Sequence, residues 1–160
     1  MEFTTADICD EKNTTVQVLK PNFYSYGGIS KCFGRVKTIK IDEDNTDLIS
    51  MLKEQGDGQI AVVDAQGSFC AIVGDTLMGY AKENNWAGIV VNGYVRDTSL
   101  TSKIPVGLWA IGTCPLKSKK RAKSKIDIEL SFGGVKFISG DYLYADCDGI
   151  ILTKERILPS

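Results

Sequence analysis

The chain has 160 residues, of which 43% are hydrophobic and 24% are charged, and its formal net charge at pH 7 is −1. These values are typical of a soluble globular protein, and the length fits one domain, residues 1–160. A charge near zero gives no general attraction to nucleic acid or to an anionic membrane. No apolar run reaches the roughly 20 residues that span a bilayer. The acidic N-terminus is unlike a secretory signal, so we expect a cytoplasmic location.

The absence of histidine excludes several classes of active site. Neither a Ser-His-Asp or Cys-His catalytic unit nor a histidine-based zinc site can be built. The five cysteines are odd in number, widely spaced and without a C-x-x-C pair, which argues against a disulfide framework and a zinc ribbon. A metal bound through oxygen ligands alone would be of the Mg, Mn or Ca type.

The first half of the chain predicts two helices and two strands. In chain order they are a helix at residues 5–12 capped by Thr4 or Thr5, a half-exposed strand at 33–41, a helix within 43–56 capped by Asn45 or Thr46 and ended by Gly56, and a short buried strand at 59–65. The first strand is predicted because apolar and basic residues alternate along it. The second helix is predicted by the helical spacing of Leu48, Met51 and Leu52.

The second half predicts one more helix and then strands only. A helix beginning near Gly74 has a mostly apolar stripe, and it lies between the apolar residues 71–73 and the strand at 88–93. The order strand, helix, strand predicts a crossover connection and a parallel pair. Beyond Lys103 five strand patterns follow, separated by glycine-containing turns. The fold class is therefore α/β, a layered β/β/α sandwich of the swivelling-domain type with a mixed sheet.

Two adjacent strand ends offer candidate site residues. Gly74, Asp75, Thr76 and Leu77 open a helix directly after an apolar strand, and unpaired N–H groups at such a place can hold a carboxylate or phosphate. Arg96 and Asp97 follow the next strand, where Asn92-Gly93 is available to turn the chain. If the strand continued, its alternation would point these two adjacent side chains to opposite faces. If the chain turns there, both side chains can line one pocket. Taken singly, an ordinary helix start and a surface ion pair are the simpler interpretations.

The joint spacing of these residues is more specific. Twenty residues separate Asp75 from Arg96, and Asp97 follows at once. This D-x20-R-D pattern resembles the motif of the class II pyruvate aldolases that cleave 4-hydroxy-4-methyl-2-oxoglutarate. Their family also contains the regulator of ribonuclease activity A, an inhibitor of ribonuclease E. The resemblance extends over nearly the whole chain, including the segments FYSYGG, AKENNWAGIVVNGYVRD and FGGVKF…GDYLYADCDGIIL.

The resemblance implies a role for each site residue. Asp97 matches the carboxylate that holds a divalent metal, usually Mg or Mn. Arg96 matches the arginine that binds the substrate and steadies the enolate. Gly74, Asp75, Thr76 and Leu77 match the segment whose backbone receives the pyruvyl carboxylate, and Asp75 also matches the acid that orients a water on the metal. The implied activity is cleavage of a 4-hydroxy-2-oxoacid, with oxaloacetate decarboxylation as a secondary activity, in a homotrimer or a pair of trimers.

Two alternatives stay open at the level of sequence. The first is a non-catalytic regulator that binds and inhibits ribonuclease E, although Asp97 keeps the part needed for metal chemistry. The second concerns a loop at residues 116–125, whose basic side chains could touch RNA or an acidic protein segment: Lys117, Lys119, Lys120, Arg121, Lys123 and Lys125. Because no aromatic residue interleaves to stack bases, a solvated loop is the simpler interpretation, and we expect no nucleic-acid partner.

Overall fold

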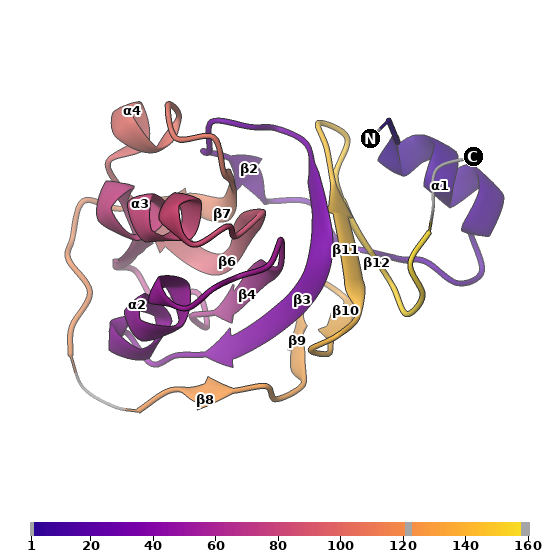
Figure 1. Ribbon diagram of the computed structural model, residues 1–160. Coiled ribbons are helices and arrows are strands. Elements are labelled where there is room, and N and C mark those ends of the chain that lie inside the picture. The colour runs from indigo at the N-terminus through magenta and orange to yellow at the C-terminus, as the bar shows by residue number, and fades with distance from the viewer. Residues whose placement is uncertain (1, 121–122, 158–160) are drawn as a thin grey trace.

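A mixed sheet of ten strands runs through the middle of the molecule (Figure 1). The structure is a computed structural model that describes residues 2–120 and 123–157. The strands are β1 (Gln17–Val18), β2 (Tyr24–Ser25), β3 (Cys32–Lys40), β4 (Ile60–Asp64), β5 (Ala71–Val73), β6 (Gly88–Val95), β7 (Gly107–Thr113), β8 (Lys125–Ile126), β11 (Tyr142–Ala145) and β12 (Ile150–Thr153). Their order is β1-β12-β11-β3-β4-β6-β7-β2, with β5 beside β6 and β8 beside β3.

The centre of this sheet is parallel and its flanks are antiparallel. Strands β3, β4, β6 and β7 are parallel neighbours, and β5 is parallel to β6. Strands β11, β12 and β2 join antiparallel. A separate antiparallel hairpin is formed by β9 (Leu130–Phe132) and β10 (Val135–Phe137). The sheet is therefore mixed, as the sequence predicts.

Helices cover one face of the sheet and the hairpin covers the other (Figure 1). The helices are α1 (Thr5–Lys12), α2 (Thr46–Lys53), α3 (Asp75–Glu83) and α4 (Thr98–Thr101). Side chains of α2 and α3 pack with one face of the central strands in one core, while β9 and β10 pack with the opposite face in a second core. This arrangement confirms the predicted β/β/α layering. Helix α1 packs apart from these layers, through Ile8 against Tyr144 and Ile151 of β11 and β12.

Alternation along the parallel strands explains why both faces are buried. In β6, Ile89 and Val91 point into the helical core, whereas Val90 points into the hairpin core. All three side chains are fully buried. A strand covered on both faces has a continuous apolar sequence instead of an alternating one, which is why residues 88–91 have no polar position.

Several local predictions differ from the structure. Strand β6 continues to Val95, so Asn92-Gly93 does not end it; the chain leaves the sheet only at Arg96. Asn45 takes the N-cap position of α2, but its side chain makes no capping bond. Instead it donates to the Ile72 carbonyl at 2.8 Å. The short elements β1, β2 and α4 were not predicted, because two to four residues are too few to show a period.

None of the helices in the described part of the chain has the length and apolar character needed to cross a membrane.

Candidate active site

The predicted site residues come together where β5 runs into α3 and β6 runs into α4. The Arg96 N–H donates to the Val73 carbonyl at 3.0 Å, which holds the two strand ends side by side. A Cβ built on Gly74 would lie 2.8 Å from Asp97 Oδ2 and 3.5 Å from Arg96 Cγ. The Asp97 carboxylate thus lies beside Gly74, at the place that a larger side chain at residue 74 would need. Residues 20 or more positions apart in the sequence are neighbours because parallel strand ends meet at one edge of the sheet.

The backbone conformation of Asp97 explains how two adjacent side chains serve one site. Asp97 has φ 56° and ψ 37°, the left-handed region that only a few per cent of non-glycine residues adopt. It lies at the N-cap position of α4, yet its side chain makes no capping bond there. Its carbonyl accepts the N–H groups of Leu100 and Thr101, each at 2.9 Å. The carboxylate is therefore left free to face Gly74.

The Arg96 side chain lies beside the Asp97 carboxylate but forms no tight hydrogen bond with it. Arg96 Nε lies 3.6 Å from Asp97 Oδ2, and Arg96 Nη1 donates to the Pro115 carbonyl at 3.5 Å. Both distances exceed the 2.7–2.9 Å of a tight charge-assisted hydrogen bond. The side chains are 39% and 42% exposed, respectively, so both can meet a ligand from solvent. No sequence pattern indicates the Pro115 contact, because it depends on how the loop after β7 passes β6.

The first turn of α3 presents backbone donors next to this pair. Gly74 is the N-cap residue and has no side chain to cap the helix, and the first helical bond runs from the Met78 N–H to the Gly74 carbonyl at 3.1 Å. Within the described residues, the N–H groups of Asp75, Thr76 and Leu77 have no hydrogen-bond acceptor. The positive end of the helix dipole adds to the attraction for an anion. The Leu77 side chain is buried, so Leu77 can contribute only its backbone.

The donor set at this place fits a hard divalent cation. Asp97 offers carboxylate oxygen, the ligand that Mg and Mn prefer, and its half-exposed position leaves room for the waters that Mg retains. The missing side chain of Gly74 leaves open the space beside Oδ2 that a Cβ would fill. Sulfur and imidazole ligands are not needed for such a site.

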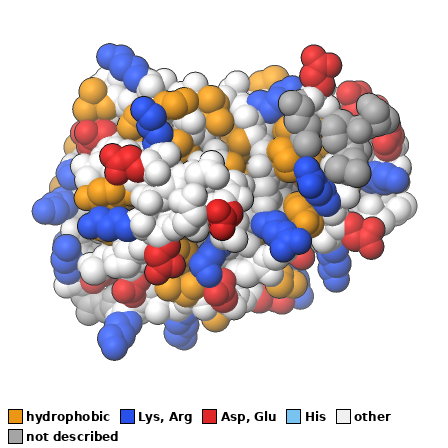
Figure 2. Space-filling view, viewed as in Figure 1, with side chains coloured by type: hydrophobic (Ala, Val, Ile, Leu, Met, Phe, Trp, Pro, Cys, Tyr) orange, Lys and Arg blue, Asp and Glu red, His pale blue; other side chains and the backbone are white. Residues whose placement is uncertain are grey.

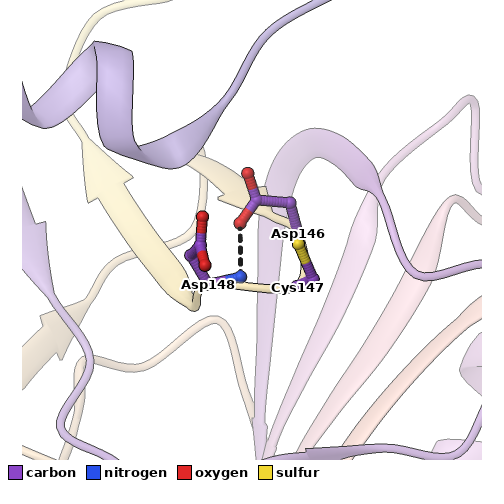
Figure 3. A group of neighbouring side chains, drawn as sticks. All are labelled: Asp146, Cys147 and Asp148. Carbon is purple, nitrogen blue, oxygen red and sulfur yellow. Dashed lines mark hydrogen bonds between the residues drawn. The ribbon is translucent and has the colours of Figure 1, made fainter.

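A second group of potential metal ligands lies elsewhere, in the turn between β11 and β12 (Figure 3). One ligand atom from each of Asp146, Cys147 and Asp148 lies within 4.8 Å of the others. The Asp146 carboxylate, however, accepts hydrogen bonds from Thr5 N and Thr5 Oγ1, both at 2.7 Å, and from Asp148 N at 3.0 Å. The Asp146 carboxylate therefore already accepts hydrogen bonds from the turn and from the start of α1, a structural role that is common for aspartate in turns.

The basic loop lies against an acidic segment. The Lys119 N–H donates to the Glu43 carbonyl at 2.8 Å, and the Ser124 N–H donates to Asp47 Oδ2 at 2.9 Å. In Figure 1 the segment that follows β7 passes the outer side of α2. Acidic and basic side chains are interspersed over the face shown in Figure 2. Arg121 lies outside the described residues. Two hydrogen bonds from backbone N–H groups therefore hold the two ends of the described loop beside the segment that contains Glu43 and Asp47.

An acid and an arginine lie at the carboxyl ends of parallel strands, beside a helix N-terminus, which is where open α/β sheets commonly bind their ligands. Residues 5–152 match the RraA-like family, described as Aldolase/RraA, and the chain belongs to this family.

Relatives of this chain have names that point to an aldolase. A protein of Laribacter hongkongensis (strain HLHK9) named "Putative 4-hydroxy-4-methyl-2-oxoglutarate aldolase" is 44% identical over 159 residues, which are 99% of this chain and 100% of that protein. A protein of Bacillus cereus with the same name is 39% identical over 154 residues, which are 96% of this chain and 97% of that one.

Solved structures of similar fold have other names. The "S-adenosylmethionine: 2-dimethylmenaquinone methyltransferase" of Geobacillus kaustophilus HTA426 superimposes with a TM-score of 0.94 at 39% identity and covers 97% of both chains. The "RNA-processing inhibitor RraA" of Thermus thermophilis has a TM-score of 0.93 at 40% identity, over 100% of this chain and 96% of that one. Because one fold can support unrelated functions, the function has to be inferred from the residues of the site and not from the fold.

Proposed function

We propose that the chain is a divalent-metal-dependent class II aldolase that cleaves 4-hydroxy-4-methyl-2-oxoglutarate, or a related 4-hydroxy-2-oxoacid, and decarboxylates oxaloacetate as a secondary activity. The observation that supports this most is that the Asp97 carboxylate lies beside Gly74, within 2.8 Å of where a Cβ would be. A carboxylate that could bind a metal, an arginine and a helix N-terminus are therefore neighbours. The names of the relatives agree with a carbon–carbon lyase.

The proposal gives each of these residues a role in binding. Asp97 would hold Mg or Mn, which when bound supplies Lewis-acid stabilisation of negative charge on the 2-oxo group. The N–H groups of Asp75, Thr76 and Leu77 would donate to the substrate carboxylate, because they are unpaired and lie at the positive end of α3. Arg96 would donate to the 2-oxo oxygen, where charge develops as the carbon–carbon bond breaks.

The cleavage requires two proton transfers: one removes the proton of the C4 hydroxyl, and the other adds a proton to C3 of the enolate. Asp75 would orient a water that takes the proton from the C4 hydroxyl. The C3–C4 bond then breaks, the hydroxyl carbon becomes a carbonyl, and the electron pair passes to C2–O as the pyruvate enolate. Protonation at C3 releases pyruvate, so that 4-hydroxy-4-methyl-2-oxoglutarate gives two pyruvates. Loss of carbon dioxide from oxaloacetate leaves the same enolate. No lysine Schiff base is required.

A regulator of RNA processing is the second candidate function. It is favoured by the 40% identity and the full coverage of the match to the RNA-processing inhibitor RraA. Under this proposal the chain would bind ribonuclease E without needing Asp97 for chemistry. The two functions can coexist on one chain, and in both cases we propose a homotrimer or a pair of trimers.

The first experiment measures pyruvate release from 4-hydroxy-4-methyl-2-oxoglutarate and from oxaloacetate with Mg, with Mn and with a chelator. We expect turnover that needs metal, and a loss of kcat/KM of about 100-fold or more in Asp97→Asn. Asparagine suits this substitution because it tolerates the left-handed backbone of residue 97. Asp148→Asn, at an exposed carboxylate outside the site, serves as the matched control and should keep full activity.

The result that would overturn the proposal is also specific. If the intact, folded protein with metal releases no pyruvate from either compound, the aldolase proposal is wrong. Binding to purified ribonuclease E and inhibition of its cleavage would then be measured. Equal inhibition by the intact protein and Asp97→Asn would support the regulator proposal.

A further inference from the structure

We infer that Asp64 and Asn92 are positioning residues for the site: their hydrogen bond fixes a β-bulge that turns β6 from β4 toward β5 and so places Arg96 and Asp97 beside Gly74. The inference rests on the proposed function of Arg96 and Asp97, and adds two residues that do not touch the substrate.

The bulge is visible in the pairing of β6. Val91 pairs with Ala110 of β7, and Tyr94 pairs with Gly112, so β6 uses one more residue than β7 over the same stretch. The extra residue lies at Asn92-Gly93. Such a bulge bends its strand, increases the local twist and is common next to active sites.

The bulge coincides with a change of neighbour. Strand β6 pairs with β4 up to the register Asp64↔Asn92, and with β5 from Ala71↔Tyr94 onward. The Arg96 N–H then continues this second pairing by donating to the Val73 carbonyl at 3.0 Å. The direction in which β6 leaves the bulge therefore decides whether Arg96 and Asp97 reach Gly74.

Asn92 fixes the bulge through its side chain and its backbone. Its Nδ2 donates to Asp64 Oδ1 at 2.9 Å, and its carbonyl accepts the N–H groups of Ala65 and Gly67 at 3.2 Å. Asp64 is 6% exposed, and the same Oδ1 also accepts the Gln66 N–H at 2.9 Å. A buried carboxylate that loses a donor is costly, because its desolvation is no longer compensated. The bulge and the turn after β4 thus hold each other in one geometry.

The residue next to Asn92 allows the close approach. A Cβ on Gly93 would lie 2.9 Å from the Ala65 Cβ, which is closer than side-chain carbons come. Only glycine at this position lets the bulge pack against the turn that contains Ala65. The Asn-Gly pair was predicted to end the strand; in the structure it bends the strand instead.

Strand β5 has a matching irregularity. Its register with β6 shifts between Ala71 and Val73, which leaves Ile72 as the extra residue. The Ile72 carbonyl accepts Asn45 Nδ2 at 2.8 Å. Both strands that form the site therefore have an irregularity near their carboxyl ends, and an asparagine amide forms a hydrogen bond at each.

The test exchanges the side chains of Asp64 and Asn92 and measures both Mn binding and activity. Asn92→Asp would put a second carboxylate against Asp64, so we expect Mn affinity and kcat/KM to fall roughly tenfold or more. In the double variant Asp64→Asn/Asn92→Asp the amide and the carboxylate change places, and both values should return to within about threefold of the intact protein. Mn affinity is obtained from the electron paramagnetic resonance signal of free Mn, which needs no substrate.

A control separates positioning from general loss of stability. Asn84 is also a half-buried asparagine, and its Nδ2 donates to the Tyr80 carbonyl at 2.9 Å at the far end of α3. Asn84→Asp should lower the melting temperature and leave Mn affinity unchanged. Should Asn92→Asp not fold, Asn92→Ala is measured in its place, with the same roughly tenfold loss expected.

The outcomes distinguish this inference from the proposed function. Absence of both Mn binding and turnover in the intact protein contradicts the proposed function. If the intact protein binds Mn and turns over substrate, full affinity in the folded Asn92 variant overturns the positioning role. Failure of the double variant to recover, although it folds, overturns it as well.

Discussion

Asp97 adopts a left-handed backbone conformation that is unfavourable for most residues other than glycine. This conformation directs its carboxylate toward Gly74. The left-handed turn at φ 56° takes the chain out of β6 and lets Asp97 point at Gly74 instead of capping α4. Strain of this kind persists only where the surroundings fix it, and it is concentrated at functional sites. The Arg96 N–H and the Asp97 carbonyl are both hydrogen-bonded, and these bonds hold the conformation.

Substitution of Gly74 tests the contact at the residue level. The φ of Gly74 is −137°, an extended value that alanine adopts without strain, so Gly74→Ala acts through its Cβ alone. That Cβ would lie 2.8 Å from Asp97 Oδ2 and must displace the carboxylate. We expect Mn affinity and kcat/KM to fall roughly tenfold, with little change in stability. Titration of Mn and steady-state kinetics measure both effects.

Gly79 provides the matched control for this prediction. It lies in the same helix, α3, and a Cβ there would have no atom within 4 Å. Gly79→Ala should therefore raise the free energy of unfolding by about 0.5–1 kcal/mol, as glycine-to-alanine changes inside helices do, and leave activity unchanged. Unaltered Mn affinity in Gly74→Ala would show that the contact has no part in metal binding.

The sequence predicted that the candidate residues would be neighbours, but it did not predict the contacts that position them. The parallel pairing of β5 with β6 brings the two strand ends together, as the order strand, helix, strand indicated. The left-handed turn at Asp97 and the Asp64–Asn92 bond were not predicted. No period or spacing signals them, because each depends on which strand lies next to β6.

At the level of elements, a buried carboxylate adds to the packing of Ile8 in holding α1 on the sheet. Asp146, in the turn between β11 and β12, is 5% exposed and accepts the N–H and hydroxyl of Thr5 at the start of α1. Burial acts to raise the pKa of this carboxyl, but the hydrogen bonds from Thr5 and Asp148 outweigh it, so the pKa lies below its ordinary value. Thr4 caps the same helix by accepting the Asp7 N–H at 3.0 Å.

The stability that Asp146 contributes should depend on pH in a definite direction. A carboxyl whose pKa is lowered by folding stabilises the native state fully above its unfolded pKa of about 3.9. This contribution is lost as the pH falls through the lower, folded value. Asp146→Asn should therefore lower the free energy of unfolding by about 1–3 kcal/mol at pH 7, and the difference from the intact protein should narrow below about pH 4.

Denaturant titrations at pH 7 and pH 3.5 measure this difference. Asp148→Asn is the matched control, because Asp148 is exposed and only its backbone N–H bonds to Asp146; its effect should stay within about 0.5 kcal/mol. A constant effect of Asp146→Asn at both pH values would contradict the role given to the ionised carboxylate.

Helices α1, α2 and α3 were predicted from the sequence, whereas the short elements β1, β2 and α4 were not, for a physical reason. Helices α1, α2 and α3 have eight or nine residues, enough to show a period or a cap, and the predicted ranges agree with them. The two-residue strands β1 and β2 and the four-residue α4 owe their form to tertiary contacts. One such contact is the bond from Thr101 Oγ1 to the Tyr26 carbonyl at 2.7 Å.

For the molecule as a whole, the central sheet connects the two hydrophobic cores, because the same strands contribute side chains to both. Strands β3, β4, β6 and β7 contribute alternate residues to the helical core and to the hairpin core. Loss of packing on one face therefore removes support from the other. Each core also contains one tryptophan: Trp86 in the helical core, 4% exposed, and Trp109 in the hairpin core, 3% exposed. Buried aromatic side chains of this size contribute strongly to core packing.

This geometry predicts that both cores unfold in a single transition. Val90→Ala and Val91→Ala create a cavity on opposite faces of β6, and each should lower the free energy of unfolding by about 2–3 kcal/mol, because both side chains are fully buried. Fluorescence of Trp86→Phe reports the hairpin core alone, and that of Trp109→Phe the helical core alone. At equal protein concentration, each valine variant should shift the urea midpoint of both reporters equally, with unchanged slope. A shift seen by only one reporter would mean that the two faces of the sheet unfold independently.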